Sequence, residues 1–425
     1  MPRSRQQPLE HSLLLTATFC LLAGGAVMVF SASSARTLLE GQGDGTAYLV
    51  KYVLYGAVGL VVMQVLARVG LDKVRRVTPL LLLVAFVLLL LVLIPGVGVR
   101  INGARRWLGA GPIQFQPAEI MKLALVLHAV AMIAARPAIT RGLRAAGPIF
   151  LPGAAAVVLI AAQPDLGTAL VCSFTMAAIL VVGGLPIRQL TLVAAGGALL
   201  VLLFALLEPY RRARLVSFLD PWAHAGTDGF QSVQGQIAIG SGGLFGLGPG
   251  QSVQKIYYLP EAHTDFILAV IGEELGLAGI CGLLALYGMI AYAGLRTAKA
   301  ARDAYGKLLA SGITSLILCQ ALLNVYTVLG LAPLTGVPLP FISSGSTSLI
   351  VLLSSMGLLL NVASGSTTQL RAVKDPSRTA QARRARDPDG GTRKEGHART
   401  TDRDRGRRDG RSRGPGHRGG RRAAG

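Results

Sequence analysis

Apolar stretches long enough to cross a membrane recur along the chain as far as residue 364. A helix needs roughly 20 apolar residues to cross a hydrocarbon core of about 30 Å. The clearest stretch, Leu80–Leu93, contains only Leu, Val, Ala and Phe. Ten such stretches are present, and each predicts one transmembrane helix: 12–33, 47–67, 77–96, 114–135, 147–163, 166–186, 188–207, 264–294, 308–331 and 346–364.

Some of these stretches allow a second interpretation. Only Pro164-Asp165 separates 147–163 from 166–186, so the pair is also compatible with a tight re-entrant hairpin. The first stretch follows two arginines and precedes small residues, as a signal peptide does. Its apolar run, 13–30, exceeds the roughly 7–15 residues of a signal core, which favours a retained transmembrane helix.

The composition agrees with a membrane protein. Hydrophobic residues make up 52% of the chain and charged residues only 15%, against roughly 25% charged residues in soluble domains. We therefore expect an all-α integral membrane protein of about ten transmembrane helices. Its expected parts are a cytoplasmic segment at 1–11, a polytopic membrane domain at 12–368 with a large outer loop at 208–263 between spans 7 and 8, and a disordered cytoplasmic tail at 369–425.

The distribution of Lys and Arg between alternate loops predicts the orientation. Loops on the side of the N-terminus carry 14 of these residues before the tail, and the opposite loops carry 8. The positive-inside rule therefore places both termini in the cytoplasm. Seven of the eight outer cations lie in the loops 97–113 and 208–263. Such clusters predict an anionic ligand such as a pyrophosphate, with lipid headgroups or local acids as the alternative partners.

The tail at 369–425 combines 18 Lys and Arg with 7 Asp and Glu, a net charge of 18 − 7 = +11. Because it has almost no apolar residues, it cannot bury a core and is expected to be disordered. Its charge favours adhesion to anionic lipid of the inner leaflet. Similar Arg- and Gly-rich runs bind nucleic acid, but beside a membrane we expect lipid contact and no nucleic-acid partner.

Ionisable residues within or beside membrane spans are expensive and are therefore candidates for function. Glu119 and Lys122 share one helix face, which is equally consistent with a structural ion pair and with a substrate role. Asp265 stands at the outer mouth of the eighth span, where a reduced dielectric favours proton uptake by a carboxylate. That property suits a general base, and the same position suits a helix N-cap. The four cysteines lie inside predicted spans without paired spacing, so no disulfide framework or metal site is indicated.

Two outer segments have sequences that interrupt regular helix. Residues 239–250 are rich in glycine but lack the Gly-Lys-Ser/Thr ending of a P-loop. Residues 330–340 contain three prolines and two glycines before the last span. Irregular backbone at membrane depth is tolerated where it is buried in protein or lines a cavity. We therefore expect both segments to frame one outer cavity.

Several motifs in the same order resemble the SEDS family of bacterial cell-wall synthesis. The strongest is Ser252–Ile267, which reads SVQKIYYLPEAHTDFI, and it is followed by Ile271–Gly276. Gln163-Pro-Asp-Leu-Gly167 and Phe341-Ile-Ser-Ser-Gly345 also fit the family. The resemblance covers about 12–365 and is closest to the FtsW/SpoVE branch. The chain departs from the family at Ala118, where Ser is usual, and at Ser346, where Gly is usual.

The resemblance implies a ten-helix peptidoglycan glycosyltransferase that polymerises lipid II on the outer face of the bacterial cytoplasmic membrane, in cell division. It implies a class B penicillin-binding protein as partner, together with other divisome membrane proteins. Asp265 matches the essential acidic residue of the family, a general base on the acceptor sugar, with undecaprenyl pyrophosphate leaving. A divalent cation, Mg²⁺ or Mn²⁺, is compatible with this chemistry. Trp107 is expected to shape the groove or to act as an interfacial anchor.

The expected substrate-binding residues lie in or beside the outer loops and the motifs that resemble the family: Trp107, Arg106, Glu119, Lys122, Arg212, Arg214, Lys255, Glu261, His263, Ser343 and Ser344. Two other functions remain open from the sequence. Charged residues within spans, including Lys51, are compatible with a lipid II flippase, although no internal repeat supports one. A non-catalytic scaffold that recruits the transpeptidase would not require Asp265.

Overall fold

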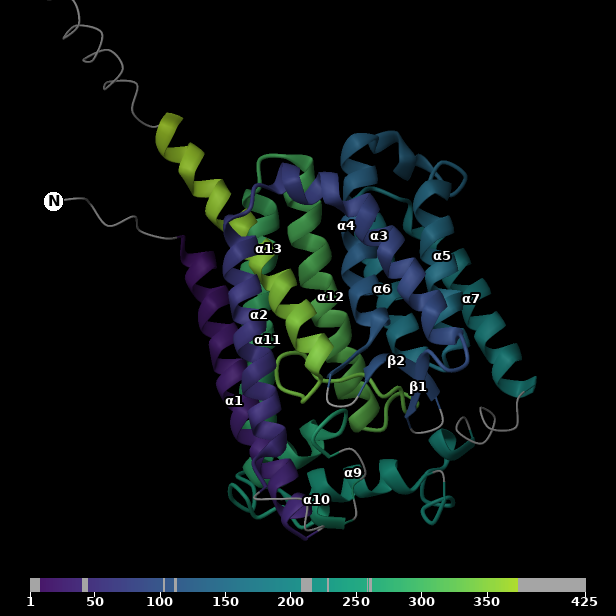
Figure 1. The fold of residues 1–425 in the computed structure, drawn as a ribbon, viewed down its shortest axis with the longest axis vertical. Helices are drawn as coiled ribbons and strands as arrows, with labels where there is room; N and C mark the ends of the chain where they lie inside the picture. The colour runs from purple at the N-terminus through teal and green to yellow at the C-terminus, as the bar shows by residue number, and fades with distance from the viewer. Residues whose placement is uncertain are drawn as a thin grey trace, which may run out of the picture. The chain divides into compact units, whose positions relative to one another are not determined.

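The structure is a computed structural model that describes residues 8–39, 45–101, 104–110, 113–207, 216–227, 229–257, 259 and 262–373. The predicted tail beyond residue 373 and most of the predicted segment 1–11 lie outside these residues. The described chain is mainly helical (Figure 1). Its helices are α1 Leu9–Leu39, α2 Ala47–Arg68, α3 Leu71–Leu93, α4 Pro117–Ala135, η1 Pro137–Arg141, α5 Gly147–Ala162, α6 Leu166–Val182, α7 Ile187–Leu207, α9 Phe230–Ser241, α10 Gln254–Tyr257, α11 Ile267–Ala300, α12 Ala304–Val328 and α13 Ser346–Val373.

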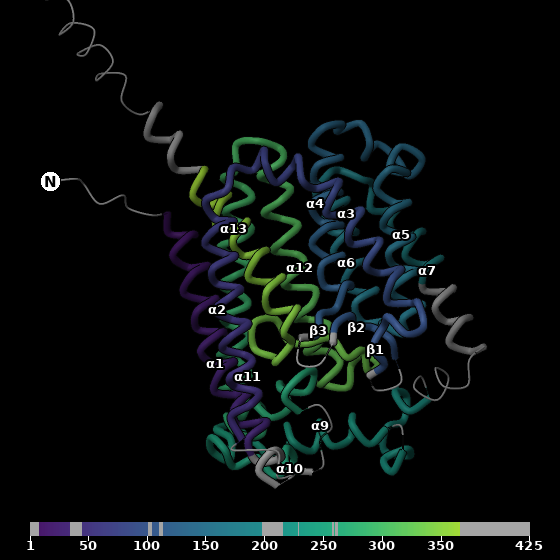
Figure 2. The backbone as a smooth tube through the Cα atoms, in the orientation of Figure 1, coloured from purple at the N-terminus to yellow at the C-terminus, as the bar shows by residue number. Residues whose placement is uncertain are grey.

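Each of the ten predicted spans overlaps one long helix, namely α1 to α7 and α11 to α13. By length and composition, seven of the helices in the described ranges can cross a membrane, and α5 and α6 are shorter apolar helices. The fold is therefore that of a multi-pass membrane protein. The start of α1 and the end of α13 lie at one end of the bundle, and α9 and α10 lie at the other (Figures 1 and 2).

Helices α1, α3 and α13 extend beyond the ranges that the sequence predicted for them. α1 begins at Leu9, within the segment expected to precede the first span. α3 begins at Leu71, six residues before the apolar run that predicted it. α13 continues through Val373 and so extends into the range predicted as a disordered tail. In each case the helix continues past the apolar core, because polar residues at a membrane surface do not end a helix.

A small antiparallel sheet interrupts the otherwise all-α architecture. Strands β1 Gly98–Ile101, β2 Ala104–Ala110 and β3 Ile113–Phe115 are arranged in the order β1-β2-β3. Val99 pairs with Trp107, and Leu108 pairs with Phe115. The all-α membrane fold is confirmed, and within it the loop between α3 and α4 satisfies its backbone groups by strand pairing, which the sequence analysis did not predict. Strand β3 also includes residues 114 and 115, which the prediction assigned to the fourth span.

The helix α11 is broken at Gly276, whose φ of 67° and ψ of −163° are non-helical. The glycine-rich segment 243–248 fills the break with backbone hydrogen bonds. Leu247 and Gly248 donate to the carbonyls of Glu273 and Glu274 at 2.9 and 3.0 Å. On the other side, Leu277 N donates to Gly243 O at 2.9 Å. Part of the loop predicted at 208–263 is thus built into α11, and Asp265 lies just before Ile267, the first residue of that helix.

Candidate functional site

Asp265 lies immediately before α11, where the backbone is held from two sides. The amide of Asn324, on α12, donates through Nδ2 to Asp265 O at 2.7 Å and to Val337 O at 2.8 Å. The Thr264 hydroxyl donates to the Asp265 carboxylate at 3.1 Å. The Asp265 side chain is half-buried. A single interior amide therefore ties the start of α11 to the segment that precedes α13.

The segment 330–345 passes directly beside the Asp265 carboxylate. A Cβ placed on Gly336 would lie 3.8 Å from Asp265 Oδ2, and φ at this glycine is +68°. Ser344 N donates to His263 O at 3.1 Å. Phe341 is a non-glycine residue at φ 64°, a conformation that costs energy and clusters at functional sites.

Two tyrosines from separate helices hold the strained residue in place. The Tyr52 hydroxyl, on α2, donates to Phe341 O at 2.5 Å. The Tyr287 hydroxyl, on α11, donates to Pro340 O at 2.6 Å. Inside the same turn, Leu339 N donates to Ser343 Oγ at 2.8 Å. The segment 330–340 thus lies beside Asp265, and the outer cavity that it was expected to frame with 239–250 stays a prediction.

A second cluster surrounds Asp165, which caps α6 by accepting from Thr168 N at 3.2 Å. Asp165 also accepts from Gln116 Nε2 at 2.7 Å. The Arg106 guanidinium lies 3.9 Å from the Asp165 carboxylate and donates to the carbonyls of Gln163 and Pro164. The motif Gln163–Gly167, which the sequence singled out without a role, thus fixes Arg106 on the turn between α5 and α6.

The two clusters belong to one band of polar contacts across the bundle. On α6, Gly167 is packed so closely that an added Cβ would meet Thr335 O at 2.5 Å and the Val337 side chain at 2.4 Å. Gly336, between those two residues, faces Asp265. Gln116 N donates to Thr347 Oγ1 at 3.1 Å, which connects the Asp165 cluster to α13. Motifs far apart in the sequence therefore meet at one level of the bundle.

The Glu119–Lys122 pair lies inside the protein beside this band. Lys122 Nζ is 2.8 Å from Glu119 Oε2, with both side chains 2% exposed. Lys122 also donates to Gln320 Oε1 at 2.7 Å, and Gln320 donates to Pro338 O at 2.9 Å. The pair thus supports the segment 330–345 from within. This geometry favours the structural interpretation of the pair, and its substrate role stays a prediction.

A lysine that binds the substrate's pyrophosphate has to be accessible, but Lys255 does not lie on an open surface. Its Nζ lies 2.7 Å from Glu274 Oε1 and donates to Ser31 Oγ and Gly250 O, each at 2.9 Å. The lysine and glutamate side chains are 3% and 0% exposed. The ammonium is therefore already surrounded by three oxygen acceptors. The physical reason is that Glu274, on α11, would otherwise be a buried charge without a partner.

The neighbouring Glu273 is also used internally. It accepts from the Ser252 hydroxyl and, at 3.0 Å, from Val253 N. Both glutamates therefore attach the segment around α10 to the break in α11.

The remaining predicted site residues are placed differently. The His263 ring stacks on Tyr48 with centroids 4.3 Å apart, beside Asp265 in the chain. Ser344 Oγ is buried without a hydrogen-bond partner in the described structure. Trp107 lies on β2 and is partly exposed. Arg212, Arg214 and Glu261 lie outside the described residues. Within the described ranges no three His, Cys, Asp or Glu side chains are grouped as a metal site requires.

Comparison with known proteins assigns the chain to a family. The model of the cell cycle protein family FtsW/RodA/SpoVE matches residues 11–368. The stage V sporulation protein E of Bacillus subtilis is 39% identical over 355 residues, which cover 82% of this chain and 96% of that protein. A probable peptidoglycan glycosyltransferase FtsW of Nitrosococcus halophilus is 40% identical over 361 residues, 84% of this chain and 92% of that one. The chain therefore belongs to the FtsW/RodA/SpoVE family, as the motifs predicted.

Solved structures agree with this assignment. One solved structure concerns the structural coordination of polymerization and crosslinking by a peptidoglycan synthase complex. A chain of that structure superposes on this one with a TM-score of 0.71 at 30% identity. The rod shape determining protein RodA of Thermus thermophilus gives a TM-score of 0.61 at 28% identity. Each comparison covers 86% of this chain and 99% of the other chain. The helical membrane fold is thus confirmed by experimental structures of relatives.

Proposed function

We propose that this chain is a peptidoglycan glycosyltransferase that polymerises lipid II into glycan strands. Asp265 accepts the proton of the acceptor sugar's 4-hydroxyl. That oxygen forms a bond to the anomeric carbon of the donor sugar, and the bond from this carbon to the pyrophosphate oxygen breaks. The electron pair leaves with undecaprenyl pyrophosphate. The observation that carries the proposal is the position of Asp265, which Asn324 and Thr264 hold at the outer end of α11. The family of this chain also includes relatives named as probable peptidoglycan glycosyltransferases.

Charge on the leaving pyrophosphate requires cations near the reacting atoms. Arg106 is the candidate that the geometry supports best, because its side chain is 25% exposed and its direction is fixed by the turn between α5 and α6. Arg212 and Arg214 belong to the other cationic loop, 208–263, and stay candidates by sequence. Lys255 is the weakest candidate, because its ammonium already forms a buried ion pair with Glu274.

The proposed setting is the bacterial cytoplasmic membrane, with both termini in the cytoplasm and Asp265 on the outer side. The excess of Lys and Arg in the loops at the terminus-bearing end supports this orientation. Cell division is the proposed process, since relatives of this chain include proteins named FtsW. A class B penicillin-binding protein, which would crosslink the glycan product, is the proposed partner, together with other divisome membrane proteins.

A divalent cation does not fit the described residues well. Carboxylate oxygens are the ligands that Mg²⁺ prefers, yet Glu273 and Glu274 are both engaged in internal contacts. We therefore derive no step through a metal ion, and Glu261 is the residue through which a dependence on Mg²⁺ or Mn²⁺ would be tested.

The test uses the full-length protein, purified with its penicillin-binding partner and reconstituted in liposomes with lipid II. Glycan polymer on a gel is the result expected of a polymerase. A parallel assay follows the movement of fluorescent lipid II between leaflets. Translocation without polymer would instead identify a flippase, and neither activity, from folded protein, would identify a scaffold.

A further inference from the structure

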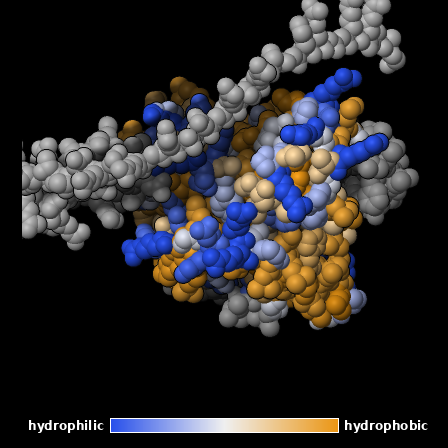
Figure 3. Space-filling view, turned by 90° about the horizontal axis from the view of Figure 1, so that it is seen from above, coloured by the Kyte–Doolittle hydropathy of each residue, from blue (hydrophilic) through white to orange (hydrophobic). Residues whose placement is uncertain are grey.

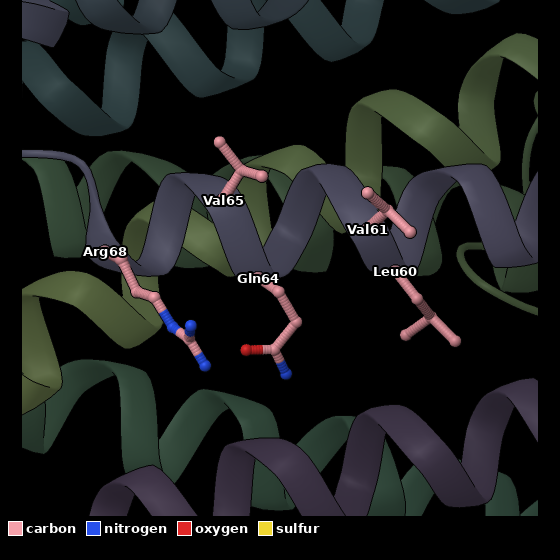
Figure 4. A pocket seen from close by; sticks show the side chains of 5 residues that line it. All are labelled: Leu60, Val61, Gln64, Val65 and Arg68. Carbon is pink, nitrogen blue, oxygen red and sulfur yellow. The ribbon is translucent and has the colours of Figure 1, made fainter.

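A groove of about 350 Å³ lies on the surface of α2, near the end of the bundle that carries the chain termini. Its lining is Leu60, Val61, Gln64, Val65 and Arg68. Figure 4 shows Leu60, Gln64 and Arg68 projecting from one side of the helix, toward α1. The groove is therefore apolar at its deep end and becomes polar toward the helix terminus.

Gln64 is out of place on a surface that faces lipid. α2 is an apolar span with only a fifth of its residues buried (22%), and the Gln64 side chain is exposed. Within the described part of the chain, neither Gln64 nor Arg68 has a recorded hydrogen bond or ion pair. Polar groups in hydrocarbon are costly unless a partner satisfies them. The ligand of this groove must therefore bring hydrogen-bond acceptors to membrane depth.

The order of side chains along α2 matches the order of groups along a phospholipid. Arg68 ends the helix, at the level where phosphates lie, and a guanidinium suits phosphate oxygens. Gln64 lies one turn, about 6 Å, deeper, where the ester carbonyls of a lipid would accept from its amide. Leu60, Val61 and Val65 then offer apolar contact to the acyl chains.

The surrounding charge favours an anionic lipid. In the view onto this end of the bundle, hydrophilic side chains gather on the end surface with hydrophobic side chains at its flanks (Figure 3). Exposed Lys and Arg of the described loops here outnumber the acidic residues Glu10, Asp72 and Asp303. Of these acids, Glu10 is paired with Arg296 at 3.2 Å, and Asp303 accepts from Gly306 N. Neither competes with a phosphate at Arg68.

We propose that this groove is a binding site for an anionic glycerophospholipid, with Arg68 on the phosphate and Gln64 on an ester carbonyl. The site is separate from the Asp265 region, because it lies at the opposite end of the bundle, and it does not depend on the proposed polymerase activity. The lipid would fill the surface between α1 and α2.

The test is thermal unfolding of the purified full-length protein in detergent, titrated with phosphatidylglycerol or with phosphatidylcholine. We expect phosphatidylglycerol to raise Tm by about 2–4 °C more than phosphatidylcholine. Loss of the charge-assisted contact in Arg68→Gln should weaken the apparent affinity for phosphatidylglycerol roughly tenfold. Gln64→Leu, which suits both helix and lipid, should weaken it by a smaller factor.

Arg76→Gln is the matched control, since Arg76 is an exposed cation at the same end of the bundle that does not line the groove. It should retain the affinity of the wild type. Equal stabilisation by both lipids would overturn the proposal. Equal losses in Arg68→Gln and Arg76→Gln would also overturn it, because they would indicate general surface charge. Displacement of phosphatidylglycerol by an equal amount of undecaprenyl phosphate would instead assign the groove to a polyprenyl lipid.

Discussion

The side-chain amide of Asn324 donates to the backbone carbonyls of Asp265 and Val337, at 2.7 and 2.8 Å. This pair of bonds is the direct connection between the residue proposed as general base and the irregular segment that precedes α13. Because the bonds reach the backbone, Asn324 positions Asp265 without altering its carboxylate. Rigid support of this kind matters, since an error of about 1 Å in the position of a reacting group can cost roughly 100-fold in rate.

Replacing Asn324 by Leu should therefore reduce glycan synthesis more than it reduces folding. Two carbonyls lose their donor, at a cost of about 1–3 kcal/mol each, and polymerisation per folded molecule should fall roughly 10- to 100-fold. The control is Asn361→Leu, because Asn361 also donates to two carbonyls, those of Leu66 and Val69. That variant should lose stability but keep its activity, and equal activity losses in the two variants would refute a positioning role for Asn324.

The Lys255–Glu274 contact predicts a specific pattern in a double-mutant cycle. Lys255→Met leaves the Glu274 carboxylate buried without its cation, at a cost of about 3–5 kcal/mol. Adding Glu274→Gln removes that charge, so the double variant should recover both Tm and polymerase activity. A double variant that is stable but inactive would mean that Lys255 binds substrate after all.

The break in α11 predicts that Gly276→Ala is harmful. Alanine at φ 67° and ψ −163°, a region that essentially only glycine adopts, costs about 1–3 kcal/mol, and its Cβ would lie 2.4 Å from Gly246 N. The inserted segment 243–248 should then detach, which hydrogen exchange of its amides would detect. Gly282→Ala on the same helix meets nothing within 4 Å and should unfold at the temperature of the wild type or slightly above it. Unchanged exchange at 243–248 in Gly276→Ala would contradict this account of the break.

The sequence was sufficient to predict the helices because each span is long and apolar, as Leu80–Leu93 illustrates. It was not sufficient for the sheet, whose strands are short and partly charged. A usable signal was present, since Asn102-Gly103 stands between β1 and β2 and Asn-Gly is a strong hairpin signal.

Site residues were predictable where motif and position coincide, as for Asp265. The burial of Lys255 was not predictable, because its partner Glu274 belongs to another segment and burial of a cation depends on contacts that no local pattern encodes. The link from Asn324 to Asp265 was not predictable from the sequence, because it depends on how α12 packs against α11. Asp165 and Gln116 likewise gained a role only when the helices were assembled.

The central claim is that Asp265 is the catalytic base. The most direct measurement compares lipid II polymerisation by Asp265→Asn with polymerisation by the wild type. Each protein is purified with its penicillin-binding partner. Asparagine preserves the size of the side chain but cannot accept the proton, so polymer should fall by roughly 100-fold or more while Tm and partner binding stay unchanged. Asp220→Asn serves as control, since Asp220 is an exposed carboxylate elsewhere in the outer loop, and it should polymerise like the wild type. Wild-type levels of polymer from a folded Asp265→Asn protein would contradict the account.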